Sequence, residues 1–150
     1  MESGAPSIVI VDDAAEVRLL LRTRLRVSGR LAVVGEGADG AEAVVLAARH
    51  QPALMLLDVS MPGTDGLTAL PKVLEASPDT RVVLYSGFEE QGLLEKARGL
   101  GASAFLKKSA PIEQLSETLL SLATVDEDDG RGGRHETDAI RWFVITWSII

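Results

Sequence analysis

The stretch "LMLLDVSMPGTDG", residues 54–66, joins an apolar run to a loop through one carboxylate, Asp58. The apolar run is short and nearly continuous, which is typical of a strand buried on both faces of a parallel sheet. Pro62, Gly63 and Gly66 then favour a turn. The acid therefore stands at the end of a buried strand, at the point where the chain has to change direction.

Strands and helices alternate along the chain on both sides of this stretch. Short β-branched and apolar runs predict strands at residues 7–11, 31–37, 53–58, 81–86 and 103–107. Helical periodicity and stop signals predict helices at residues 14–27, 41–50, 66–76, 89–100 and 111–123. Pro71 is expected to kink the third helix or to shift its start. The alternation predicts an α/β fold, in which five helices flank a doubly wound, five-stranded parallel sheet.

The composition limits the classes of protein to consider. The chain has 150 residues, of which 46% are hydrophobic and 25% charged, enough for one globular domain with a real core. It has no cysteine, which excludes disulfides, thiolate metal sites and cysteine nucleophiles. The net charge of −7 disfavours direct binding to nucleic acid. With no secretory signal and no apolar run near the ~20 residues of a membrane helix, we expect a cytoplasmic protein with no membrane contact.

The predicted domain ends before the chain does. Residues 1–123 hold all the predicted strands and helices, whereas residues 124–141 are polar, acidic and rich in glycine. Such a composition is typical of a flexible linker. The last residues, "WFVITWSII" (142–150), form an apolar tail. We expect no output domain, because residues 124–150 are too few for a helix-turn-helix module.

Polar side chains follow the predicted strands at the end of the sheet where ligands bind in open parallel α/β folds. They are Asp12 and Asp13 after the first strand, Asp58 after the third, Ser86 after the fourth, and Lys107 and Lys108 after the fifth. Three neighbouring carboxylates repel one another unless a cation joins them, and an all-oxygen ligand set favours Mg²⁺. An aspartate beside a metal and a lysine suggests phosphoryl chemistry, in which the aspartate can be the nucleophile.

These motifs resemble the receiver domain of bacterial two-component response regulators. The matching segments are "VDD" (11–13), "LLDVSMPGTDG" (56–66), "LYSG" (84–87) and "AFLKK" (104–108). The segment "VVGEGADGAEAV" (33–44) is similar to receivers that carry a helix-turn-helix output domain. The resemblance covers residues 7–123 and implies a flavodoxin-like sheet of strand order 2-1-3-4-5.

The resemblance implies a phosphoacceptor, Asp58, that takes a phosphoryl group from a histidine kinase or a histidine phosphotransfer protein. It also implies Mg²⁺ as cofactor, bound by Asp12, Asp13, Asp58 and the backbone carbonyl of Ser60. Such a nucleophile has to be fixed by the sheet yet reachable from outside it. The chain is then not an enzyme with an independent substrate, since it catalyses only its own phosphorylation and dephosphorylation.

The remaining motif residues have implied roles in switching. Lys108 is expected to pair with the phosphoryl group, with Lys107 facing solvent beside it. Ser86 is the expected switch hydroxyl and Phe105 the aromatic switch residue, although Phe105 is also compatible with a plain core position. The resemblance further implies a downstream protein partner, which the sequence does not name. A homodimer is a further possibility, through the surface of the fourth helix, fifth strand and fifth helix.

Two other functions stay open at this point. The chain could be a receiver-like interaction module that works without phosphorylation. Alternatively, "GEGADG" (35–40) matches the G-x-G-x-x-G pattern between a strand and a helix, which would fit a flavodoxin-like nucleotide or flavin binder. The second alternative leaves Asp12, Asp13 and Lys108 without a role.

Overall fold

The computed structural model describes residues 4–87, 92–108, 111–128 and 143–144. Its strands are β1 (Ser7–Val11), β2 (Ala32–Gly37), β3 (Leu54–Asp58), β4 (Arg81–Ser86), β5 (Ala104–Lys107) and β6 (Phe143–Val144). Its helices are α1 (Ala15–Ser28), α2 (Gly40–His50), α3 (Gly66–Ala76), α4 (Leu93–Gly99) and α5 (Ile112–Asp128). Apart from the end of α5 and the additional strand β6, these bounds agree with the predicted ones to within a few residues.

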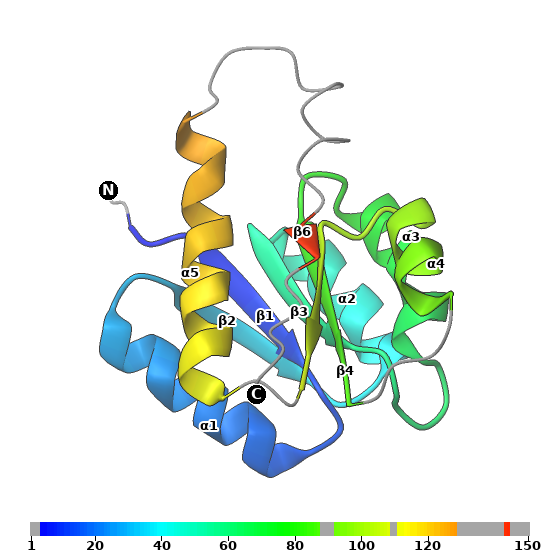
Figure 1. Cartoon of the computed structure of the whole chain (residues 1–150), viewed down its shortest axis with the longest axis horizontal. Helices are drawn as coiled ribbons and strands as arrows, with labels where there is room; N and C mark the ends of the chain where they lie inside the picture. Colours follow the sequence, from blue (N-terminus) through cyan, green and yellow to red (C-terminus); the bar gives the residue numbers. More distant parts are fainter. Residues whose placement is uncertain (1–3, 88–91, 109–110, 129–142, 145–150) are drawn as a thin grey trace.

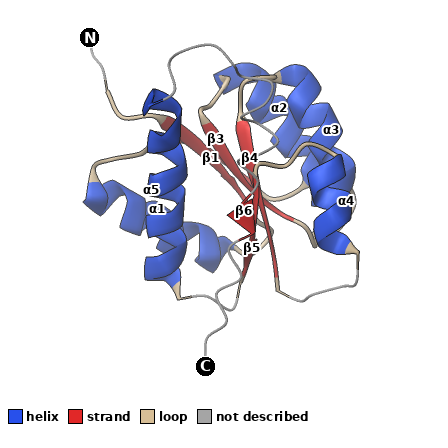
Figure 2. Ribbon diagram, turned by 45° about the horizontal axis from the view of Figure 1, so that its top comes forward, coloured by secondary structure: helices blue, strands red, loops and turns tan. Residues whose placement is uncertain are grey.

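The strands form one parallel sheet in the order β2-β1-β3-β4-β5-β6. Figures 1 and 2 show α1 and α5 on one face of this sheet and α2, α3 and α4 on the other. The predicted α/β fold and the predicted order 2-1-3-4-5 of the first five strands are therefore confirmed. Because β1 and β3 are neighbours in the middle of the sheet, their carboxyl ends lie side by side.

Both faces of the sheet are apolar, which explains the near-continuous apolar runs of the central strands. Alternate residues of each strand point to opposite faces. Toward α2, α3 and α4 the sheet contributes Val9, Val11, Met55, Leu57, Val82, Leu84 and Phe105. Toward α1 and α5 it contributes Ile8, Ile10, Leu54, Leu56, Val83, Tyr85, Ala104 and Leu106. Burial of these side chains from water on both faces is the main force that holds the sheet in place.

Local signals set the ends of several helices. Asp39 and Asp65 cap α2 and α3, and their carboxylates accept hydrogen bonds from the amides of Glu42 and Thr68 at 2.8 Å each. Pro71 does not shift the start of α3, which continues through it with the proline ring on the exposed side. The predicted start of the fourth helix, at residue 89, lies outside the described residues. None of the described helices combines the length and the hydropathy that crossing a bilayer requires.

The C-terminal part differs from the predicted flexible linker. Helix α5 continues to Asp128, past the predicted end at Ala123. Composition alone missed this extension, because a helix that is already nucleated by tertiary packing adds further residues at little cost. Strand β6 pairs with β5, with Ala104 opposite Phe143 and Phe105 opposite Val144. The rest of the predicted linker and tail, 129–142 and 145–150, lies outside the described residues.

Candidate functional site

The loop after β3 is held close to the sheet by two glycines. A Cβ atom on Gly66 would lie 2.2 Å from the carbonyl oxygen of Asp58, so no larger residue fits there. A Cβ atom on Gly40 would lie 2.5 Å from the carbonyl oxygen of Thr64, which accepts a hydrogen bond from the Gly40 amide at 3.0 Å. The first residues of α2 and α3 thus fix both ends of the loop that leaves Asp58.

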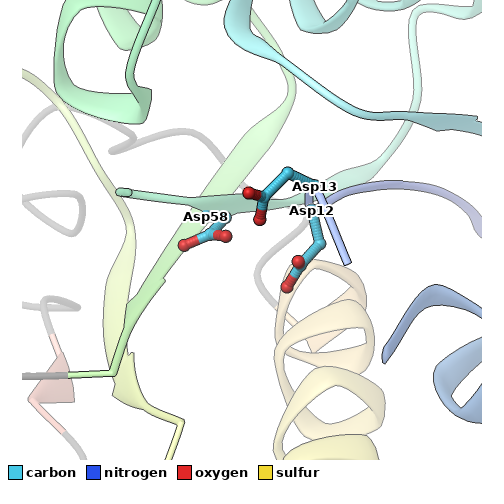
Figure 3. A group of neighbouring side chains, drawn as sticks. All are labelled: Asp12, Asp13 and Asp58. Carbon is cyan, nitrogen blue, oxygen red and sulfur yellow. The ribbon is translucent and has the colours of Figure 1, made fainter. Parts of the chain in front are cut away.

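Three carboxylates meet at the carboxyl end of the sheet, as predicted. One oxygen each from Asp12, Asp13 and Asp58 lies within 4.8 Å of the others. Figure 3 shows the three side chains, two from the residues that follow β1 and one from the end of β3. Asp12 and Asp58 are fully buried, whereas Asp13 is exposed. We refer to Asp12, Asp13 and Asp58 as the acid group.

Lys108 joins two members of the acid group. Its Nζ lies 2.9 Å from Oδ2 of Asp58 and 3.1 Å from Oδ2 of Asp12. The backbone amide of Lys108 donates to the carbonyl oxygen of Ser86 at 2.8 Å, which fixes where this side chain leaves β5. The ammonium of Lys108 therefore reaches the acid group, as the resemblance to receiver domains implied.

Both oxygens of Asp58 are already bound by groups of the chain. Oδ1 accepts a hydrogen bond from the amide of Ser60 at 3.1 Å, and Oδ2 accepts one from Lys108. The side chain has no solvent exposure. The expectation that Asp58 is reachable from outside is therefore wrong for this structure, because the side chain is buried and groups of the chain contact both of its oxygens.

The charges of this site perturb one another. Burial raises the pKa of Asp58, and the negative charge of Asp12 raises it further, while Lys108 opposes both effects. Burial on its own would lower the pKa of Lys108, but the hydrogen bonds and charges of Asp58 and Asp12 outweigh it and the pKa is raised. Lys108 therefore stays protonated, and the acid group keeps an excess of negative charge that a hard cation would offset.

The remaining predicted residues lie nearby in different surroundings. Ser86 ends β4, the strand next to β3, and is buried. Phe105 is buried in the apolar cluster beside α4, so in this structure it has the surroundings of a core aromatic residue. Lys107 ends β5 and is partly exposed. The roles of Ser86 and Phe105 in switching stay predictions, as does the role of the Ser60 carbonyl.

The "GEGADG" segment has a structural explanation. Cβ atoms on Gly35 and Gly37 would lie 3.1 and 3.0 Å from the side chain of Leu46, so these glycines let α2 pack closely on β2. The helix N-terminus is filled by its own chain, since Asp39 accepts from the Glu42 amide and Glu42 accepts from the Ala38 amide at 2.6 Å. A pyrophosphate would have to displace two carboxylates there, which argues against a dinucleotide site.

Two residues of the site were missed in the sequence. The hydroxyl of Tyr85 donates to Oδ2 of Asp12, and the guanidinium of Arg18 donates to the carbonyl oxygen of Asp12 at 2.6 Å. A tyrosine in the apolar run "VVLYS" was a usable signal, because a buried tyrosine hydroxyl needs a partner. Arg18 lies on α1, and no sequence pattern pointed to its contact with Asp12.

The comparison with known families decides what this site belongs to. A family model described as the response regulator receiver domain matches residues 8–120, and the acid group lies within that range. The chain belongs to the response regulator receiver domain family. It is thus a receiver domain of two-component response regulators, as the motifs had indicated.

Relatives of this receiver domain come from several bacteria. It is 38% identical to the oxygen regulatory protein NreC of Staphylococcus carnosus over 109 residues, which cover 72% of this chain and 50% of NreC. The chain thus spans about half the length of the curated relatives it matches. The signal receiver domain of the putative response regulator NarL from Mycobacterium tuberculosis superposes with a TM-score of 0.75 at 33% identity, over 86% of this chain and all of that one.

A third relative was solved with a metal ion. A chain of the CheX–CheY–BeF3–Mg²⁺ complex from Borrelia burgdorferi superposes on the receiver domain with a TM-score of 0.70 at 27% identity. The match covers 77% of this chain and 87% of that chain.

Proposed function

We propose that the domain accepts a phosphoryl group on Asp58 from the phosphohistidine of a histidine kinase or a histidine phosphotransfer protein. The observation that carries this proposal is the meeting of Asp58 with Asp12, Asp13 and the ammonium of Lys108 at one end of the sheet. A carboxylate nucleophile, a cation-attracting acid group and a fixed ammonium are the parts that phosphoryl transfer to an aspartate requires.

The transfer itself is a substitution at phosphorus. A carboxylate oxygen of Asp58 attacks the phosphorus atom, and the bond from phosphorus to the imidazole nitrogen breaks. The imidazole leaves with the bonding electron pair and takes up a proton, while Asp58 becomes an acyl phosphate. Lys108 leaves Oδ2 of Asp58 and pairs with a phosphoryl oxygen, and Ser86 donates a hydrogen bond to another.

Mg²⁺ is the cofactor that this donor set fits. The acid group offers oxygen ligands alone and has an excess of negative charge, which suits a hard cation. Asp12, Asp13, Asp58 and the carbonyl oxygen of Ser60 would hold the ion, which would supply positive charge against the phosphoryl oxygens. The structural relative from the Mg²⁺-containing complex supports this assignment.

Phosphorylation then changes which partner the domain binds. We assign the switch to Ser86, which ends β4, and to Phe105, which lies on β5. The surface of α4, β5 and α5 is the proposed contact for a downstream protein or a second copy. In this arrangement residues 1–123 are the signalling unit, and the only reaction that the domain catalyses is its own phosphorylation and dephosphorylation.

The test is phosphoryl uptake from a small donor such as acetyl phosphate, with Mg²⁺ or with EDTA. We expect the wild type to be phosphorylated in the presence of Mg²⁺ but not of EDTA. We expect Asp58→Asn to take up no phosphoryl group in either condition. The exposed Asp79, at the opposite end of the sheet, provides a matched control, and Asp79→Asn should be labelled like the wild type. Equal labelling of Asp58→Asn would rule out Asp58 as the acceptor.

The burial of Asp58 favours a second candidate, an interaction module that works without phosphorylation. The same experiment separates the two functions. A wild-type chain that takes no label and binds no Mg²⁺, yet still engages its partner, would support the second candidate over the first.

A further inference from the structure

Tyr85 makes two contacts with the site that the proposed mechanism does not use. Its hydroxyl donates to Oδ2 of Asp12, the oxygen that also contacts Lys108. The Lys108 ammonium lies over its aromatic ring, 4.8 Å from the ring centre. Tyr85 thus touches both an acid and the lysine of the site.

The position of Tyr85 in the sheet explains how one side chain does both. Tyr85 lies on β4, directly opposite Asp58 in the ladder between β3 and β4. Its side chain is buried on the sheet face covered by α1 and α5. Because β3 lies between β4 and β1, the side chain spans β3 to reach Asp12, which follows the last residue of β1. The phenol is the donor in this contact, because a carboxylate oxygen only accepts.

The hydroxyl of Tyr85 affects how strongly Lys108 interacts with Asp12 relative to Asp58. Lys108 lies between two carboxylate oxygens at similar distances, 2.9 Å from Asp58 and 3.1 Å from Asp12. A hydrogen bond from a phenol withdraws negative charge from Oδ2 of Asp12, which weakens its hold on any cation. Asp12 is also held at its other oxygen, since Oδ1 accepts from the Ala14 amide at 2.7 Å. Loss of the phenol would therefore change the charge of Asp12 more than its orientation.

We propose that Tyr85 is a positioning residue, which keeps Lys108 directed at Asp58 by donating to Asp12 and by carrying the ammonium on its ring. This inference rests on the proposed function, because an ammonium kept beside Asp58 is in place to pair with the incoming phosphoryl oxygen, which makes phosphoryl uptake faster. The same hydrogen bond should also lower the affinity of the domain for Mg²⁺, because it makes Asp12 a weaker ligand.

The test compares Tyr85→Phe with the wild type in two measurements. Titration calorimetry with Mg²⁺ alone gives the dissociation constant, and uptake from acetyl phosphate at saturating Mg²⁺ gives the maximal rate. We expect Tyr85→Phe to bind Mg²⁺ about threefold more tightly and to take up phosphate about fivefold more slowly. Both changes are smaller than the full effect of a hydrogen bond to a charged group, because the phenol acts on Mg²⁺ and on Lys108 only through Asp12. Tyr85→Leu, which also removes the ring, should be slower still.

Tighter Mg²⁺ binding together with slower phosphoryl uptake distinguishes a positioning role from a structural defect. Val83 lies on the same strand and in the same buried cluster, so Val83→Ala is the control for damage to the core. It should lower the urea midpoint without tightening Mg²⁺ binding. Mg²⁺ binding that is unchanged or weaker in Tyr85→Phe overturns the proposal, whatever the uptake. A wild type that takes no label, with Mg²⁺ still binding more tightly to Tyr85→Phe, would instead overturn the proposed function.

Discussion

The two ends of the parallel sheet bury polar groups in different ways. At the amino end, before β3 and β4, the hydroxyls of Ser77 and Thr80 lie 2.6 Å apart, and Thr80 donates to the carbonyl oxygen of Pro52 at 2.7 Å. The hydroxyl of Ser77 also lies 3.2 Å from the side-chain oxygen of Gln51. These groups are neutral, and each hydroxyl has its partners.

At the carboxyl end the buried groups are charged and unbalanced. Asp12 and Asp58 are fully buried, Asp13 lies beside them, and the ammonium of Lys108 reaches two of the three. Buried charge of one sign costs folding free energy, whereas satisfied neutral groups do not. The comparison teaches that the amino end contributes stability, while the carboxyl end keeps a charge excess that suits the binding of a cation.

The largest expected effect on stability comes from Lys108→Ala. Removing the ammonium leaves two buried carboxylates without their partner, which should lower the free energy of unfolding by roughly 2–3 kcal/mol at neutral pH. Lys72, exposed on α3, gives the control Lys72→Ala, which should change little. Urea unfolding without Mg²⁺ measures both. If Lys108→Ala lowers the free energy of unfolding no more than Lys72→Ala does, the buried carboxylates at the carboxyl end do not destabilise the fold when their ammonium partner is removed.

The neutral end should respond more weakly and without any link to Mg²⁺. Thr80→Val keeps the shape of the side chain but leaves the Pro52 carbonyl without this donor, at an expected cost of about 1–2 kcal/mol. Thr23 is exposed on α1, and Thr23→Val makes the same chemical change there for comparison. A loss for Thr80→Val that varied with Mg²⁺ concentration would contradict the separation of the two ends.

The smallest expected effect, that of Asp58→Asn, is an increase in the free energy of unfolding. The raised pKa of Asp58 means that the folded chain holds this proton more tightly than the unfolded chain. Ionised Asp58 therefore opposes folding, and its cost appears as the pH rises from 3.8, the ordinary pKa of this carboxyl group, through its raised pKa in the folded chain. Asp58→Asn should then be more stable than the wild type by roughly 1 kcal/mol at neutral pH without Mg²⁺, and no more stable at low pH.

Urea unfolding across this pH range, with Asp79→Asn as the exposed control, checks the sign. Adding Mg²⁺ should stabilise the wild type more than Asp58→Asn, since the ion needs the carboxylate. A mutant that is less stable than the wild type at neutral pH without Mg²⁺ would show that Lys108 fully compensates the buried charge.

Much of the site could be predicted because it follows from topology. Once Asp12, Asp13, Asp58 and Lys108 were placed at the ends of strands in one parallel sheet, their meeting was a geometric consequence. The choice of Lys108 over Lys107 did not follow from topology; the resemblance to receiver domains implied it. The strand "LMLLD" (54–58) could also be predicted from the sequence, since its apolar run and its terminal acid are both local signals.

The sequence by itself determined the order of strands and helices and the chemistry gathered at one edge, because periodicity and strand ends are local properties. The tertiary structure alone decided that Asp58 is covered by Lys108, that Tyr85 reaches Asp12 beneath β3, and that β6 joins the edge of β5. These features depend on the direction and reach of side chains across neighbouring strands, and on pairing between distant segments. Such long-range packing has no period along the chain from which it could be read.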